Sequence, residues 1–465
     1  MTMEMELRDK SGDICQPDNS SKSYNTPYNR DIDRIAGRTI RELYDSDNSL
    51  LIFPDTLGQN RDGIDSLHLL TKKRHNDEEV TISTGNLMGF VGTGSTQITI
   101  YSRFAKFADD TSQDYFLHYM LQRVCAVNLF DMKYGMSQDT IFDFLLYLFP
   151  YHLKRAVQQG IFRQYRTRLY NDANIKGPID IPRHIRCNIP FNGRIAYRTR
   201  EYVCDNPITQ LIRHTIEYIR QNPAVSSILF TDKLIRDAVS DIVAATPSYS
   251  PGARQRVLTE NLRPVHHPYF LSYLPLQRLC IHILQHRRMK FSNSDNRVYG
   301  ILFDGAWLWE EYLYKTVFAR CGFLHPRNKT GAGGIYLFEK DERKPTSGSR
   351  YPRYPDYYKK GVMVLDAKYK HLDNNLIDRD DIHQIISYMH VEEIQTGGFI
   401  YPKADDENRS VSTVLLGSLR GYGGTIWNIG IPIPGDCPAY NDFVDKMKKT
   451  EDELVETIEK IAIQQ

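Results

Sequence analysis

Two aspartates and a lysine in the C-terminal part of the chain have the types and spacing of a divalent-cation site. Asp356 follows Pro355, and Asp366-Ala-Lys368 begins ten residues after Asp356, directly behind the apolar run 362–365. If the two segments are strands of one hairpin, both carboxylates lie at the same end of a sheet. Mg²⁺ prefers oxygen ligands and keeps several waters, so two aspartates with the backbone carbonyl of Ala367 form a plausible partial shell.

Lys368 is expected to act beside this cation. Side chains alternate along a strand, so Lys368 projects from the same face as Asp366. Its ammonium would favour formation of hydroxide from a bound water and offset negative charge on a phosphate. Glu310, on a preceding helix, is a further candidate that would hold the metal through a water. The adjacent Glu311 is an alternative for the inward-facing position.

The Asp-x-Lys pattern is not specific by itself, because it also occurs at 131–133. That first copy follows a segment of helical periodicity, whereas Asp366 ends a short β-like run with a Pro-Asp one hairpin earlier. Gln384 and Tyr388 are spaced i, i+4 on a predicted helix and would project toward the same site as accessory residues. Two alternatives stay open: the hairpin is a charged surface turn, and Gln384 and Tyr388 only cap and pack.

The segments around these residues predict an α/β core. The expected order is a helix at 305–319, strands at 334–338, 355–358 and 362–365, a helix at 380–391, strands near Phe399 and Ile426, and a closing helix at 441–461. Upstream, glycine-bounded strands at 80–83, 87–91 and 97–101 predict a small β unit. Helices are expected at 112–124, with Ser112 as N-cap, and at 139–157, 207–219, 232–244 and 270–286.

We therefore predict a multidomain α/β protein, since 465 residues exceed the length of one typical domain. Residues 1–35 are polar and predict a disordered tail. Residues 36–205 predict an N-terminal β/α region, 206–290 a helical connecting region, and 291–465 the α/β domain that carries Asp366.

Composition limits the class of protein. Hydrophobic residues make up 41% and charged residues 25%, which excludes wholesale disorder and a membrane-embedded chain. The longest apolar stretch, 140–149, is about half of a membrane span. No signal pattern opens the chain, so we expect a cytoplasmic protein without membrane contact. The seven cysteines include no Cys-x-x-Cys pair, which argues against a zinc site. His282 and His286 are spaced i, i+4, but no third ligand lies at a spacing that suggests zinc.

Positive charge is concentrated in residues 151–200, which hold eleven Lys and Arg against two acids, although the whole chain has a net charge of only +2. Such a segment favours contact with a polyanion or an acidic protein. A merely solvated basic face is the alternative.

In order along the chain, these motifs resemble a known nuclease family. One resemblance is to the PD-(D/E)xK nuclease core. It is carried by the series Glu310, Pro355-Asp356, Asp366-Ala-Lys368 and Gln384-x-x-x-Tyr388. Over most of its length the chain resembles McrC, the nuclease subunit of methylcytosine-directed, McrBC-type restriction systems. The pieces that carry this wider resemblance are Ser83–Val91, Ile98–Phe104, Gly160–Tyr165, Ile175–His184, Leu308–Tyr312 and Gly398–Pro402.

The resemblance implies a C-terminal PD-(D/E)xK restriction-endonuclease-like domain that hydrolyses double-stranded DNA with Mg²⁺, for which Mn²⁺ can substitute. Asp356, Asp366, Lys368 and Glu310 would be its catalytic residues. It also implies that the N-terminal region docks on, and stimulates, a hexameric McrB-like AAA+ GTPase that recognises and translocates DNA. The sequence contains no Gly-x-x-x-x-Gly-Lys-[Ser/Thr] loop, so we expect GTP to bind the partner.

A non-catalytic adaptor that activates the GTPase, with a decayed nuclease core, is the alternative function. Asp356, Asp366 and Lys368 are all present, and buried charges without a metal are costly to retain. This favours the enzyme.

Overall fold

The computed structural model divides the chain into two compact units, Met1–Phe130 with Asn293–Gln465, and Asp131–Ser292. The first Asp-x-Lys motif, at 131–133, lies outside the described residues, as do residues 10–23 and 28–30 of the predicted tail. The described residues are 3–9, 24–27, 31–46, 50–54, 67–74, 79–93, 96–108, 111–125, 138–223, 225–265, 267–289, 298–326, 333–338, 351–370, 377–404, 410–421, 423–435 and 437–463.

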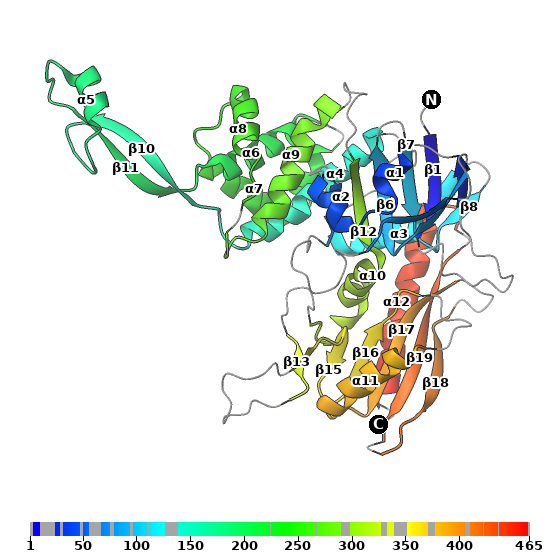
Figure 1. Cartoon of the computed structure of the whole chain (residues 1–465). Helices are drawn as coiled ribbons and strands as arrows, with labels where there is room; N and C mark the ends of the chain where they lie inside the picture. The colour runs from blue at the N-terminus through cyan, green and yellow to red at the C-terminus, as the bar shows by residue number, and fades with distance from the viewer. Residues whose placement is uncertain are drawn as a thin grey trace. The chain divides into compact units, whose positions relative to one another are not determined.

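The N-terminal part of the first unit is built on a five-stranded sheet of order β1-β7-β6-β12-β3 (Figure 1). β1 pairs in parallel with β7, and β6 pairs antiparallel with β7. β12 pairs antiparallel with β6 and in parallel with β3. A strand from far along the chain therefore completes this sheet. The strands are β1 (Met3–Arg8), β3 (Leu50–Phe53), β6 (Leu87–Thr93), β7 (Thr96–Tyr101) and β12 (Val298–Asp304).

The beginning of the chain belongs to this sheet, so the predicted disordered tail at 1–35 is wrong where the structure describes it. Met5 and Leu7 are buried, and Glu6 between them is exposed, which is the period-two pattern of a strand with one face on a core. Helix α1 (Ile32–Ile35) likewise buries two isoleucines. The polar residues around these short apolar patterns hid them in the sequence.

A smaller sheet and two more helices accompany the first sheet. The strand order of the smaller sheet is β2-β5-β4, and its strands are β2 (Tyr24–Pro27), β4 (Leu70–Arg74) and β5 (Glu79–Thr84). Asp114 accepts a hydrogen bond from the backbone N–H of Leu117 at 3.0 Å, so Asp114, and not the predicted Ser112, caps α3. The remaining elements are α2 (Ile40–Ser46), the hairpin of β8 (Lys106–Ala108) with β9 (Thr111–Gln113), and α3 (Tyr115–Cys125).

The C-terminal part of the first unit is a mixed sheet of order β15-β16-β17-β19-β18. β16, β17 and β19 are parallel neighbours, while β15 and β18 are antiparallel edge strands. The predicted α/β core is thereby confirmed. The elements, in chain order, are α10 (Gly305–Leu313), the π-helical turn η4 (Tyr314–Phe318), β13 (Ile335–Tyr336), β14 (Pro352–Arg353), β15 (Tyr357–Lys359), β16 (Met363–Ala367), α11 (Arg379–Val391), β17 (Thr396–Ala404), β18 (Ser412–Ser418), β19 (Thr425–Ile433) and α12 (Tyr440–Ile463).

Helix α11 makes the crossover between the parallel strands β16 and β17. Ile385 and Met389 of this helix pack against Val364 of β16 and Phe399 of β17 in one buried cluster. Parallel neighbours need such a crossover, because a tight turn can join only strands that run in opposite directions. The crossover fixes α11 beside the end of β16, where Asp366 lies.

A buried carboxylate ties the closing helix α12 to α3 and α10. Glu451 is 4% exposed. One of its oxygens accepts hydrogen bonds from the hydroxyls of Tyr119 and Tyr312, each at 2.8 Å, and the other accepts from Arg123 at 2.9 Å. Three elements that are distant in sequence therefore share one charged group.

The second unit consists of helices and one two-stranded arm. β10 and β11 pair antiparallel along their full lengths, with α5 at the far end of the hairpin (Figure 1); we call residues 164–203 the arm. Among the described helices, none combines the length and apolarity needed to cross a membrane. The elements are α4 (Gln138–Val157), β10 (Gln164–Asp172), α5 (Ile181–Asn188), β11 (Ile195–Val203), α6 (Pro207–Arg220), η2 (Ser226–Phe230), α7 (Lys233–Ala245), η3 (Pro251–Ala253), α8 (Arg254–Glu260) and α9 (Tyr273–Met289).

This two-unit division differs from the predicted domains. The predicted boundary after residue 205 falls inside the second unit, between β11 and α6, whereas the boundary after residue 290 lies close to the observed one. β12 was assigned to the C-terminal domain 291–465, but it pairs with β6 and β3. Local sequence patterns do not encode which distant strand a segment pairs with, so the insertion of the second unit into the first was missed.

We expect Glu451→Ala to lower the free energy of unfolding by about 3 kcal/mol or more, because Arg123 and two tyrosine hydroxyls lose their shared acceptor. Glu456→Ala, on the same helix, removes only an exposed carboxylate 3.5 Å from Lys460, and should cost less than about 0.5 kcal/mol. Denaturant unfolding followed by circular dichroism measures both. Equal effects of the two variants would show that the buried network does not stabilise the unit.

Candidate active site

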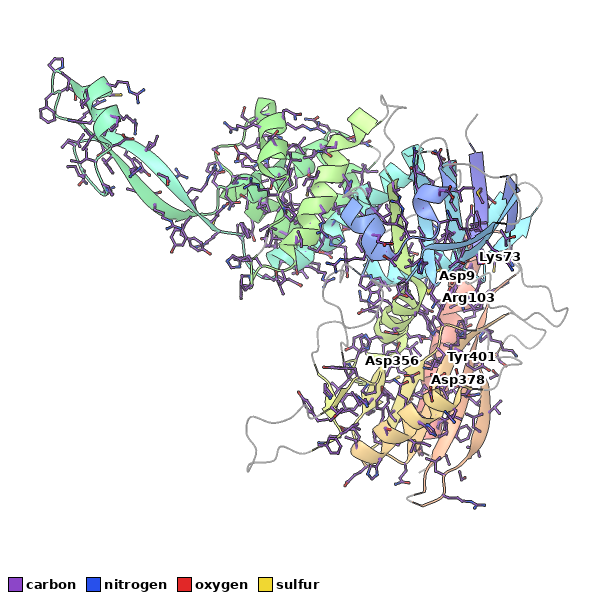
Figure 2. All side chains as sticks on the ribbon, in the orientation of Figure 1. Asp9, Lys73, Arg103, Asp356, Asp378 and Tyr401 are labelled. Atoms are coloured by element: carbon purple, nitrogen blue, oxygen red, sulfur yellow. The ribbon has the colours of Figure 1, made fainter. Side chains whose placement is uncertain are left out.

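The predicted hairpin brings Asp356 and Asp366 together. Tyr357 of β15 is opposite Leu365 of β16, so the preceding Asp356 faces the following Asp366 across the strand pair. Asp356 Oδ2 accepts a hydrogen bond from the backbone N–H of Ala367 at 2.6 Å. Asp366 is only 4% exposed, whereas Asp356, beside β15 in Figure 2, is partly exposed. The hairpin therefore places both carboxylates at the same end of the strand pair.

Lys368 lies on the same side as Asp366, as the strand alternation predicts. Its Nζ is 2.6 Å from Asp366 Oδ2, an ion-pair distance. That oxygen is inaccessible to solvent and accepts no well-aligned hydrogen bond from any residue in the described part of the chain. A buried carboxylate oxygen with a cation beside it, but no directed donor, retains capacity for a further ligand.

Burial and like charge dominate the electrostatics of the two aspartates. Burial, and then the neighbouring charge of Asp366, raise the pKa of Asp356 to about 7. Burial also raises the pKa of Asp366, although the Lys368 ammonium opposes the shift. For Lys368, burial would lower the pKa, but the carboxylates of Asp366 and Asp381 outweigh it and raise the pKa above its ordinary value. The ionised pair therefore requires more positive charge than Lys368 supplies.

Asp381, in the first turn of α11, is a site residue that the sequence analysis missed. Its Oδ1 is 2.8 Å from Lys368 Nζ, and its Oδ2 is 3.5 Å from Lys370 Nζ. Asp381 precedes the predicted Gln384 by three residues, which places both on neighbouring positions of one helix face. That spacing was the available signal, but the acidic run at the start of the helix resembled an ordinary favourable charge near a helix N-terminus.

The accessory pair also reaches the site. Gln384 Nε2 donates a hydrogen bond to the Tyr388 hydroxyl at 2.6 Å. Burial raises the pKa of Tyr388, and the charges of Asp366 and Asp356 contribute to the same shift. Tyr388 is therefore near both carboxylates, so Gln384 and Tyr388 lie on the face of α11 that borders the hairpin.

Glu310 and Glu311 are both close to the hairpin, but through different groups. The main-chain oxygen of Glu310 accepts a hydrogen bond from the Tyr357 hydroxyl at 2.7 Å. The side chain of Glu311 is 3.8 Å from Nε2 of His325, whose Nδ1 donates to the main-chain oxygen of Asp356 at 2.6 Å. His325 was missed because its loop has no motif.

The donor set fits a hard divalent cation better than zinc. Within the described ranges, no three His, Cys, Asp or Glu side chains gather as a metal site. The candidate donors are the carboxylates of Asp356 and Asp366, with the buried Oδ2 of Asp366 as the atom that best fits a cation. Few protein oxygens with waters suit Mg²⁺, whereas zinc takes mostly nitrogen and sulfur. Ligation by the Ala367 carbonyl, and by Glu310 through a water, stay predictions.

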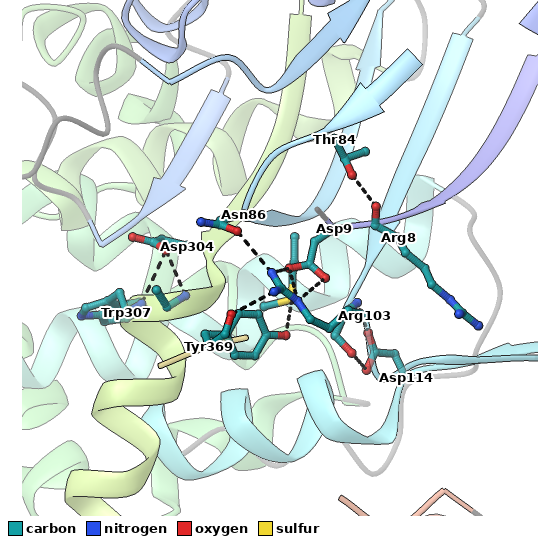
Figure 3. Close-up of polar contacts among 12 residues, drawn as sticks. Arg8, Asp9, Thr84, Asn86, Arg103, Asp114, Asp304, Trp307 and Tyr369 are labelled. Atoms are coloured by element: carbon teal, nitrogen blue, oxygen red, sulfur yellow. Dashed lines mark hydrogen bonds and ion pairs between the residues drawn. The ribbon is translucent and has the colours of Figure 1, made fainter. Parts of the chain in front are cut away.

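A buried ion pair just beyond the ends of β1 and β7 anchors the chain just after β16. Arg103 Nη2 is 2.5 Å from Asp9 Oδ2, and Arg103 Nη1 donates to the main-chain oxygen of Tyr369 at 2.8 Å (Figure 3). Both charged side chains are almost inaccessible to solvent. The guanidinium also lies over the Tyr369 ring, 4.4 Å from its centroid. The residue that follows Lys368 is thus held by a charge-assisted hydrogen bond from another sheet.

Comparison with known protein families shows to which family the chain belongs. The family described as McrBC 5-methylcytosine restriction system component has a sequence model that matches residues 82–402. The chain belongs to this family. The match covers the site strands β15 and β16, helix α11 and the whole arm. No match was found among the curated proteins.

Two solved structures resemble this McrBC-family chain at low sequence identity. One is described as a refined half-complex from a tetradecameric assembly of Thermococcus gammatolerans McrB AAA+ hexamers with bound McrC; it is 14% identical, has a TM-score of 0.45, and the alignment covers 96% of this chain and 100% of that chain. The other is described as the Thermococcus gammatolerans McrBC complex; it is 15% identical, has a TM-score of 0.29, and the alignment covers 67% of this chain and 86% of that chain.

We expect Asp356→Asn to stabilise the metal-free protein at pH 8 by on the order of 1 kcal/mol, because the amide removes a buried like charge. The raised pKa means that protonation of Asp356 favours the folded state. This contribution is complete below the unfolded pKa near 4 and is lost as the pH rises through about 7. The advantage of Asp356→Asn should therefore shrink at pH 5.

Thermal unfolding in EDTA at both pH values measures this difference. Asp380→Asn, which changes a side chain that is 89% exposed, is the control and should have little effect at either pH. A loss of stability in Asp356→Asn at pH 8 would show that this carboxylate is a structural group.

Proposed function

We propose that the chain is the nuclease subunit of a GTP-dependent McrBC-type restriction complex and hydrolyses DNA phosphodiesters with Mg²⁺. The observation that carries this proposal is the facing pair of carboxylates, Asp356 and Asp366, with the Lys368 ammonium beside them. The raised pKa of Asp356 and the buried Oδ2 of Asp366 are features expected of a cation-binding site.

The topology of the C-terminal sheet supports a PD-(D/E)xK assignment. The aspartates lie on the antiparallel hairpin of β15 and β16, and α11 then crosses over to the parallel strand β17. The order of motifs along this path is Asp356, then Asp366 with Lys368, then Gln384 with Tyr388, which is the order of the resemblance described above.

In the proposed mechanism, the chain supplies ligands, charge and orientation. Asp356 and Asp366 would hold the cation, and Glu310 would contribute through a water. Lys368 places its ammonium beside Asp366, where it orients the attacking water and offsets charge that develops on the phosphate. Gln384 and Tyr388 border the hairpin as accessory groups. A bound Mg²⁺ would supply Lewis-acid activation of water and of the phosphodiester.

We further propose that the chain docks on an AAA+ GTPase hexamer of the McrB type, which would bind GTP and recognise double-stranded DNA. Family membership supports this partner, and one of the Thermococcus gammatolerans structures is described as McrB AAA+ hexamers with bound McrC. The arm has the surface of an interface, because large apolar side chains are exposed on it among basic ones. These apolar residues are Tyr165, Leu169, Ile175, Ile179, Ile181, Ile185, Ile189, Phe191 and Tyr202.

In the adaptor alternative the nuclease core has decayed. It predicts that removal of the site charges leaves the function of the protein unchanged. The ion pairs of Lys368 and the buried position of Asp366 argue for the enzyme, since an unused buried charge destabilises the fold. DNA cleavage decides between the two functions.

We expect Asp356→Ala, Asp366→Ala and Lys368→Ala each to lower Mg²⁺-dependent DNA cleavage by about a hundredfold or more, because each removes a group that binds the cation or stabilises charge at the phosphate. The assay contains the partner GTPase and GTP. Asp380→Ala is the matched control, because it removes an exposed carboxylate from the same domain.

Assembly with the partner should be unchanged in all of these variants. Cleavage at the wild-type rate by Asp366→Ala would show that the hairpin is not the catalytic site. Failure of the three variants to assemble would instead indicate a structural role.

We expect charge reversal on the arm, Arg186→Glu with Arg194→Glu, to lower GTPase stimulation or DNA binding by about tenfold or more, because like charges at an interface repel. Arg236→Glu with Arg256→Glu makes the same change in charge at exposed positions on α7 and α8 of the same unit, and should have little effect. GTP hydrolysis rates and DNA-binding isotherms measure both variants. Unchanged stimulation and DNA binding in the arm variant would exclude the arm as a contact surface.

A further inference from the structure

The Lys368 ammonium lies between two carboxylates of the first unit. It is 2.6 Å from Asp366 Oδ2 and 2.8 Å from Asp381 Oδ1. Asp381 is largely buried, and its second oxygen is 3.5 Å from Lys370 Nζ. Lys368 therefore has two alternative anionic partners at nearly equal distance, one on β16 and one on α11.

In the proposed function, the first of these partners, Asp366, also has to bind the divalent cation. Asp366 Oδ2 is the oxygen best suited to a divalent cation, yet Lys368 occupies its surroundings. Two cations within contact distance of one buried oxygen repel each other strongly, because the low-dielectric surroundings screen them poorly. Binding of a metal at Asp366 requires that the ammonium be held elsewhere, at a small displacement.

We propose that Asp381 is a positioning residue that takes over the Lys368 ammonium from Asp366 when a divalent cation binds. The inference rests on the proposed metal site at Asp356 and Asp366. Asp381 keeps the lysine next to the cation while it weakens the competition of Lys368 for the metal-binding oxygen. Without Asp381, Asp366 is the remaining carboxylate in contact with Lys368 among the described residues.

The position of Asp381 suits this role. It lies in the first turn of α11, where the helix dipole favours a negative charge. Lys370 Nζ is near its second oxygen, so Asp381 has a cation on each side. Its neighbour Asp380 lies in the same turn, but its side chain is 89% exposed and 3.9 Å from Arg379. Asp380 therefore has the same helix-end charge without the contact to Lys368.

The test measures metal affinity directly, with Mn²⁺ alone as the probe and free Mn²⁺ quantified by electron paramagnetic resonance. The full-length chain is used without partner or DNA. Asp381→Asn should weaken Mn²⁺ binding by about tenfold, the worth of one charge-assisted contact. Asp380→Asn, the matched control, should change it by less than about twofold. Thermal unfolding establishes that both variants are folded.

A double-variant cycle separates this role from a general effect of charge. In a Lys368→Met background there is no ammonium to relocate, so Asp381→Asn should lose most of its effect and approach that of Asp380→Asn. An equal loss of affinity in both backgrounds would overturn the proposal, because Asp381 would then act without Lys368.

Asp366→Asn distinguishes this failure from failure of the metal site. If it abolishes Mn²⁺ binding while Asp381→Asn binds like wild type, only the role of Asp381 is wrong. If it leaves Mn²⁺ binding unchanged, the metal site and the role of Asp381 are both wrong.

Discussion

Two like charges held close together at the end of a buried strand are the constraint on which this structure depends. Asp356 and Asp366 face each other across a hairpin, and burial makes their ionisation costly. Such an arrangement is unfavourable in a purely structural role, since a neutral pair of similar shape would pack at lower cost. The surrounding cations, Lys368 above all, only partly offset this charge. This uncompensated charge is the physical basis of the proposed cation site.

The scaffold holds this pair from several directions. β16 supplies Asp366, α11 borders it with Tyr388, and the N-terminal sheet reaches the same strand end through Arg103 and the Tyr369 carbonyl. A buried guanidinium that satisfies a backbone carbonyl and a carboxylate is specific in geometry, because its donors form a rigid fork. The N-terminal part of the unit is thus linked to the site, although Asp9 and Arg103 precede Asp356 by more than two hundred residues in the chain.

The two units divide the chemistry of the chain. The titratable cluster lies in the first unit, whereas the exposed apolar and basic side chains of the arm lie in the second. Most side chains of β10 are exposed, so they are available to a partner and contribute little to a core. This division is consistent with the proposed docking of the arm on a partner.

The sequence by itself determined what short-range physics encodes. Apolar periodicity predicted most of the helices and the C-terminal strands, and the Asp356 and Asp366 motifs with strand alternation predicted the hairpin and the side of Lys368. The tertiary structure alone decided that β1 and β12 complete the first sheet, and that Asp381 and His325 join the site. These contacts connect distant segments, and their stability comes from burial summed over the whole fold. No local pattern of residue types carries that information.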